Sequence, residues 1–131
     1  MKKIRYKVVK KRNRTSAMLH GNSKYALKYL DGWKVYADAK TVGVMVFETA
    51  ASAKEWVWAW NTCGFYHDDK DLIILKVLPL GRGKRIIWLA PDIDTETIDR
   101  FYKGDDDLRL GEAPDHTIAY PGVEVLGEYK W

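Results

Sequence analysis

The chain has 131 residues and one cysteine, with 22 Lys and Arg against 18 Asp and Glu and a formal net charge of +4. This length suits a single domain over residues 1–131, and no apolar run approaches the roughly 18–20 residues of a membrane-spanning helix. The lone Cys63 excludes an internal disulfide, and because only His67 lies near it among the Cys and His residues, we expect no metal site.

The first third of the chain predicts short strands. Residues 4–9 alternate apolar and basic side chains, and the Asp31-Gly32 pair is a strong hairpin-turn signal. Residues 42–47 are apolar throughout, which is typical of a central strand. The strands expected in this part of the chain are 4–9, 16–19, 25–30, 33–36 and 42–47.

A helix is predicted over residues 49–62, although the stretch WVWAW places tryptophans at every second position. Thr49 is a plausible N-cap, and no Gly or Pro occurs before Gly64. On a helical wheel, Ala53, Trp56, Val57 and Trp60 share one face, which predicts that they are core residues. Trp58 lies on the opposite face and is a candidate interaction residue.

The rest of the chain predicts further strands and a second helix over residues 95–103, capped by Asp94 and ended by Gly104. The expected strands are 72–78, 85–89, 116–120 and 123–126. Together these elements predict an α+β domain, with about seven or eight short strands in a mostly antiparallel sheet and two helices at about 49–62 and 95–103.

Positive charge is concentrated early in the chain. Residues 1–30 hold ten Lys and Arg and no acid, whereas residues 31–131 hold twelve against eighteen Asp and Glu. Such a segment attracts phosphate-bearing or acidic partners. Lysines on an edge strand also prevent aggregation between sheets, and this second interpretation stays open.

Candidate anion-binding residues fall in two groups, the first hairpin and the turn PLGRGK; they are Lys7, Lys10, Lys11, Arg12 and Arg14, and then Arg82, Lys84 and Arg85. The turn lacks the Ser or Thr and the following helix of a P-loop. If the two groups converge, they form a basic face on which Tyr6, Tyr25 or Trp33 could stack bases. Tyr25 and Trp58 are the candidate interaction residues, and no cofactor is indicated.

The order of several segments resembles short uncharacterised proteins encoded by bacteriophages and prophages. The matching segments are RYKVVKKR, KYALKYLDG, VGVMVFETAASAKEW, ILKVLPLGRGKR and APDHTIAYPGVEVLGE. The resemblance implies a viral origin and a location in the host cytoplasm or in the virion, and it supplies no activity.

Shorter segments are similar to the ADP-ribosyltransferase fold. They are Leu19-His20-Gly21, the strand Val44 to Phe47 with the helix start Ala53 to Trp56, and Leu75 to Gly81. The family carries a catalytic glutamate before a late strand, and the corresponding Asp115 to Tyr120 contains none. This resemblance implies either such an enzyme or an inactive relative that holds a nucleotide.

The sequence therefore predicts a small viral, non-enzymatic binding module whose basic N-terminal segment engages nucleic acid, a nucleotide or an acidic host protein. A virion structural component and the ADP-ribosyltransferase-like protein remain as alternatives.

Overall fold

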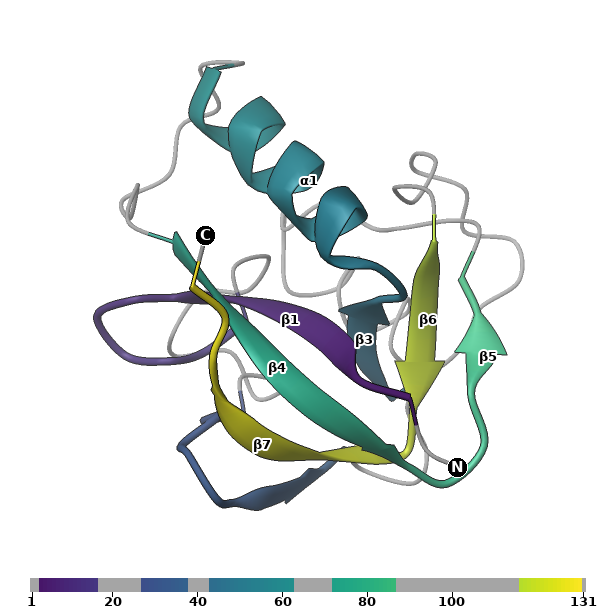
Figure 1. Cartoon of the computed structure of the whole chain (residues 1–131). Helices are drawn as coiled ribbons and strands as arrows, with labels where there is room; N and C mark the ends of the chain where they lie inside the picture. Colours follow the sequence, from purple (N-terminus) through teal and green to yellow (C-terminus); the bar gives the residue numbers. More distant parts are fainter. Residues whose placement is uncertain (1–2, 17–26, 38–42, 63–71, 87–115, 131) are drawn as a thin grey trace, which may run out of the picture.

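The computed structural model describes residues 3–16, 27–37, 43–62, 72–86 and 116–130. This described part forms one seven-stranded sheet and one helix (Figure 1). The elements are β1 (Arg5–Lys10), β2 (Lys34–Tyr36), β3 (Val44–Phe47), α1 (Ala50–Thr62), β4 (Leu72–Leu80), β5 (Lys84–Arg85), β6 (Thr117–Tyr120) and β7 (Gly122–Glu128). The strand order across the sheet is β2-β7-β4-β1-β3-β6-β5.

All strand pairs in the described sheet are antiparallel, so the predicted α+β class with a mostly antiparallel sheet is confirmed. The predicted helix 95–103 lies outside the described residues. None of the helical segments that the structure describes is long and apolar enough to cross a membrane.

The sheet buries apolar side chains on both faces because successive residues of each strand point to opposite sides. Along β1, Val8 belongs to a cluster with Phe47 and Ile74 beneath α1. The next residue, Val9, belongs to the larger cluster on the other face, which gathers side chains from β3, β4, β6 and β7. The central strand is therefore covered on both sides.

Helix α1 forms as the wheel predicts. The Ser52 backbone N–H donates to the Thr49 side-chain oxygen at 3.1 Å, which confirms the N-cap. Ala53 and Val57 are buried against the sheet, and the Trp56 ring tilts against Phe47 at 6.1 Å between centroids. The side chain of Trp60 lies outside the described part of the structure.

Several strand predictions differ in extent from the structure. Of the predicted strands 16–19 and 25–30, residues 17–19 and 25–26 lie outside the described residues, and Ser16 and Lys28 form isolated antiparallel bridges, to Val9 and to Thr15. β4 continues past the predicted end at residue 78, through Pro79 to Leu80. Pro79 is tolerated because the pairing of β4 with β1 ends at Val77, so the missing N–H breaks no ladder with β1.

Candidate functional site

The first basic group lies at the tip of a hairpin that follows β1. The Lys10 backbone N–H donates to the Thr15 carbonyl at 2.9 Å, and the Arg14 N–H donates to the Lys10 carbonyl at 2.9 Å. Arg14 takes a left-handed conformation with φ of 58°, which reverses the chain. The tip residues Lys11 and Arg12 are exposed, so the hairpin presents cations to solvent.

The hairpin is fastened to the segment that precedes β2. Arg14 Nε donates to the Tyr29 carbonyl at 2.8 Å, and the Tyr29 N–H donates back to the Arg14 carbonyl at 2.9 Å. The Arg14 guanidinium also forms an ion pair with Asp31, and Thr15 bridges to Lys28. The basic tip is thereby held beside the turn that starts β2.

That turn ends in a β-bulge that presents Trp33. The Trp33 N–H donates to the Leu30 carbonyl at 3.0 Å, and Gly32 has φ of 82°, as the predicted Asp31-Gly32 turn requires. The Gly32 N–H donates to the Val125 carbonyl at 2.8 Å, while the Val125 N–H donates to the Trp33 carbonyl at 2.8 Å. Gly32 and Trp33 thus lie opposite the single residue Val125, which is the arrangement of a G1 bulge. Trp33 is 52% exposed.

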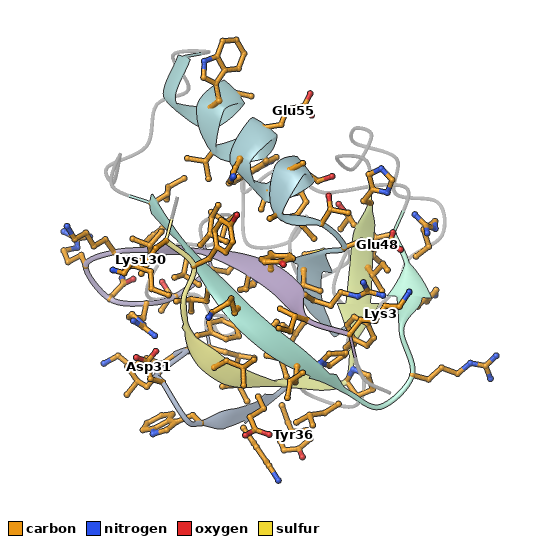
Figure 2. The ribbon with its side chains drawn as sticks, in the orientation of Figure 1. Lys3, Asp31, Tyr36, Glu48, Glu55 and Lys130 are labelled. Atoms are coloured by element: carbon orange, nitrogen blue, oxygen red, sulfur yellow. The ribbon has the colours of Figure 1, made fainter. Side chains whose placement is uncertain are left out.

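Tyr36 lies at the other end of β2 and is 59% exposed. It pairs with Gly122 of β7, and a Cβ atom built at Gly122 would stand 2.5 Å from Cδ1 of the Tyr36 ring. The ring therefore occupies the space that glycine leaves open on β7. Figure 2 shows Asp31 and Tyr36 at the two ends of this stretch of chain.

These contacts bring one set of side chains onto a continuous stretch of the molecule, which we call the hairpin–β2 surface. It consists of Lys10, Lys11, Arg12, Arg14, Lys28, Asp31, Trp33, Lys34 and Tyr36. This region holds six cations, two exposed aromatic rings and one acid. Tyr36 shares one face of β2 with Lys34, and Trp33 shares the other face with Val35, because successive strand residues point to opposite sides. Lys34 also lies opposite Glu124 on β7.

The second basic group does not join the first. Lys10 pairs with Leu72 at one end of β4, whereas Arg82 follows Leu80 at the other end. Nine strand residues separate the two groups by about 25–30 Å. Lys84 and Arg85 form β5, at the opposite edge of the sheet from β2 (Figure 1). The single basic face that convergence would form is therefore absent from the described structure.

Arg85 is already engaged with a carboxylate of this chain. Its Nη2 lies 3.5 Å from Glu48 Oε2, and His116 Nδ1 lies 3.4 Å from the same oxygen. Arg5 Nη1 donates to the Glu48 carbonyl at 3.3 Å. Desolvation works to raise the pKa of Glu48, but the hydrogen bond from His116 and the charges of Arg5, Arg85 and His116 outweigh it, so the pKa is lowered.

Lys7 is not a surface cation, contrary to the expected role in anion binding. It is only 5% exposed, and its Nζ donates to the Met45 carbonyl at 2.8 Å and to Ser16 Oγ at 3.2 Å. The same atom lies 5.3 Å from the centroid of the Tyr29 ring. Burial lowers the pKa of Lys7 to about 7.

The aromatic residues predicted to interact with a partner or to stack on bases also lie in different parts of the molecule. Trp58 is 67% exposed, but it lies on α1, which covers the face of the sheet away from the larger core (Figure 1). Tyr6 is half-buried and meets Tyr129 edge to face at 5.5 Å. Tyr25 lies outside the described residues. Of the three aromatics considered for base stacking, Trp33 is the one that the structure places beside the basic hairpin.

Sequence reasoning missed Lys28, Lys34 and Tyr36 as parts of the surface. The available signal was the short run Lys34-Val35-Tyr36 after the Asp31-Gly32 turn, in which a buried valine separates two exposed side chains. That pattern predicts a strand with one wet face, but it does not say that the hairpin lies beside it. No group of three potential metal ligands occurs within the ranges that the structure describes.

Comparison with protein-family models, with curated proteins and with solved structures found no match to this chain. The resemblances to phage-encoded proteins and to the ADP-ribosyltransferase fold are therefore neither supported nor contradicted. Of the segments that carry the ADP-ribosyltransferase resemblance, Leu19-His20-Gly21 lies outside the described residues.

Proposed function

We propose that this protein is a non-enzymatic binding module for an anionic macromolecule, and that nucleic acid is the partner. The hairpin–β2 surface would make the contact. The viral origin and the host-cytoplasmic location implied by the phage resemblance belong to the same proposal.

One observation carries the proposal: the basic hairpin is fastened to the turn that presents Trp33. Cations bind phosphates without regard to sequence, and exposed aromatic rings bind base faces. An acidic protein surface would use the cations but has no need of the rings. The combination of six cations with two exposed rings in one region, one ring on each face of β2, therefore favours nucleic acid.

A titration against salt tests this function. We expect the protein to bind fluorescein-labelled DNA at about 50 mM salt, with log affinity falling linearly on log salt because bound phosphates release counterions. Arg12→Gln removes one exposed cation at the hairpin tip and should reduce the slope by about 0.7–0.9. Lys54→Gln, on α1, makes the same charge change and should leave the slope unaltered.

Two results would contradict the proposed function. One is the absence of measurable binding to single- or double-stranded DNA and RNA at low salt. The other is an equal loss of slope in Arg12→Gln and Lys54→Gln, because net charge alone would then account for the binding.

A further inference from the structure

A second cluster of charged side chains lies across four neighbouring strands, away from the hairpin–β2 surface. Each strand contributes one member, from the strand itself or from the residue next to its end; the members are Arg5, Glu48, His116 and Arg85. The corresponding strands β1, β3, β6 and β5 are adjacent in the sheet in that order (Figure 1). The fold thus brings together four residues that are far apart in sequence.

The two arginines of this cluster lie on the face of the sheet that carries the larger core. Arg5 pairs with Val77 and Arg85 pairs with Ile118, and both partners belong to that core. Residues that lie directly opposite each other in a sheet point to the same side, so both arginines point to this face. Arg5 is also held by a hydrogen bond from its Nε to the Tyr120 hydroxyl at 3.1 Å.

Glu48 and His116 lie on the same face and fix each other. Glu48 follows Phe47, whose side chain belongs to the cluster beneath α1, so the Glu48 side chain points the other way. The Glu48 N–H donates to the His116 carbonyl at 2.8 Å, and His116 Nδ1 lies 3.4 Å from Glu48 Oε2. His116 adopts φ of 66°, which is uncommon for a residue other than glycine. The imidazole is therefore oriented with Nδ1 toward the carboxylate, which leaves Nε2 for a ligand.

Glu48 also aligns the guanidinium of Arg85 with this imidazole. The same oxygen, Oε2, lies 3.5 Å from Arg85 Nη2, and the side chains of Arg85 and His116 are 59% and 52% exposed. Arg85 has further N–H donors, and a protonated imidazole donates from both of its nitrogens. With His116 protonated, the three cations of the cluster exceed its one carboxylate by two charges. The exposed donors therefore suit an anion with two negative charges.

We propose that this cluster binds the dianion of a phosphate monoester, with Arg85 and the protonated His116 donating to its oxygens and Glu48 positioning both. This inference goes beyond the proposed function, because it assigns a second site near the opposite edge of the sheet from β2. A phosphate monoester carries close to two negative charges at neutral pH, whereas each internal phosphate of a nucleic acid carries one. The cluster therefore favours a mononucleotide or the terminal phosphate of a strand over internal phosphates.

An NMR titration with adenosine 5′-monophosphate tests the site, and adenosine is the control that lacks the phosphate. We expect the monophosphate to shift the ring-proton resonances of His116 and adenosine to leave them unchanged. His116→Asn identifies these resonances by their loss, and asparagine suits the positive φ at this position. Because Nε2 donates only when the ring is protonated, the monophosphate should bind several times more tightly at about pH 6.5 than at about pH 8.

Two substitutions on β5 test the contribution of Arg85. Arg85→Gln removes a charged hydrogen-bond donor and should weaken binding of the monophosphate about tenfold. Lys84→Gln is the matched control, because Lys84 is the preceding residue of the same strand and points to the opposite face of the sheet. It makes the same charge change and should alter the affinity less than about twofold. Circular dichroism establishes that each variant is folded.

Oligo(dT) with a 5′-phosphate distinguishes the two sources of the monoester. Tighter binding of its phosphate at His116 than of adenosine 5′-monophosphate would identify the end of a strand as the ligand, and equal or weaker binding would identify a mononucleotide. The inference is overturned if the monophosphate leaves the His116 resonances unchanged, or if Arg85→Gln and Lys84→Gln weaken binding equally. Salt-dependent binding of oligo(dT) with a 5′-hydroxyl would in that case still support the proposed function, since it requires no phosphate monoester.

Discussion

Lys7 shows at the scale of one residue how position in a sheet overrides a sequence pattern. Arg5 and Lys7 alternate with the apolar Ile4, Tyr6 and Val8, which predicts one wet face of β1. β1 is the fourth of the seven described strands, however, and apolar clusters cover both of its faces. The ammonium group therefore leaves water and is held by the Met45 carbonyl and Ser16 Oγ.

This burial makes stability depend on pH through Lys7. The folded protein lowers the pKa of Lys7 from its ordinary value of 10.5 to about 7. Between these values the unfolded chain binds the proton that the folded chain has released, so the free energy of unfolding rises with pH. The rise amounts to about 4–5 kcal/mol between pH 7 and 10.5, and below pH 7 the full penalty of burying the charge is present.

The Lys7→Met variant removes this titration and keeps a long side chain. Urea unfolding at pH 7 to 10 should show that the difference in unfolding free energy, wild type minus Lys7→Met, increases steadily with pH. Lys76→Met, on β4, serves as the control and should keep the wild-type pH dependence. A constant difference between wild type and Lys7→Met across this range would show that Lys7 is charged in the folded protein throughout.

At the scale of elements, local rules predicted where the helix and the strands occur in the sequence better than they predicted which strands pair in the sheet. Thr49 and the stripe of Ala53, Trp56 and Val57 were sufficient to predict α1 against the strand-like spacing of its tryptophans. The strand β2 was predicted from its turn. Its place beside β7, which is about ninety residues away in sequence, was not predicted, because period and turn signals carry no information on long-range pairing.

The same limit applies to the candidate site. The cations of the hairpin were identified from composition, and four of the five, Lys10, Lys11, Arg12 and Arg14, lie on the hairpin–β2 surface. Their neighbour Trp33 was one of three aromatics considered. The structure selects it because Arg14 bonds to Tyr29 and Asp31, a contact between segments that no local pattern specifies.

The pairing of β2 with β7 depends on Gly122. A Cβ atom there would stand 2.5 Å from the Tyr36 ring and 2.8 Å from the Val35 carbonyl oxygen. We therefore expect Gly122→Ala to destabilise the fold by about 1–3 kcal/mol in urea unfolding, because either the ring or the strand must move. Gly32→Asn is the control for backbone strain without a clash, since its surroundings are open and Asn is among the side chains that adopt positive φ most readily, so we expect it to cost less than Gly122→Ala. Equal effects of the two substitutions would contradict the described packing of Tyr36.

At the scale of the whole molecule, positive charge is concentrated in the described residues and negative charge in the remaining ones. The described residues contain fifteen Lys and Arg against five Asp and Glu, and the remaining residues contain seven against thirteen. The described part thus carries a formal charge of +10 in a chain of net charge +4. A field of this sign attracts polyanions over distances up to about a Debye length. The affinity for a polyanion could therefore depend on the net charge of the protein or on the arrangement of charges on the hairpin–β2 surface.

Two substitutions that each remove one negative charge separate these alternatives. Asp31 lies on the hairpin–β2 surface in an ion pair with Arg14, whereas Glu48 lies with Arg85 and His116 near the opposite edge of the sheet. Removing a carboxylate about 6 Å from a bound phosphate is worth about threefold in affinity in water, and the effect is screened at greater distances. In anisotropy titrations at about 50 mM salt, we therefore expect Asp31→Asn to bind oligo(dT) about threefold more tightly than the wild type and Glu48→Gln to change affinity less than twofold.

The advantage of Asp31→Asn should shrink as salt is raised, because the screening length falls to about 3 Å at 1 M. Equal gains from both substitutions would show that net charge governs binding and that the hairpin–β2 surface has no special part in it.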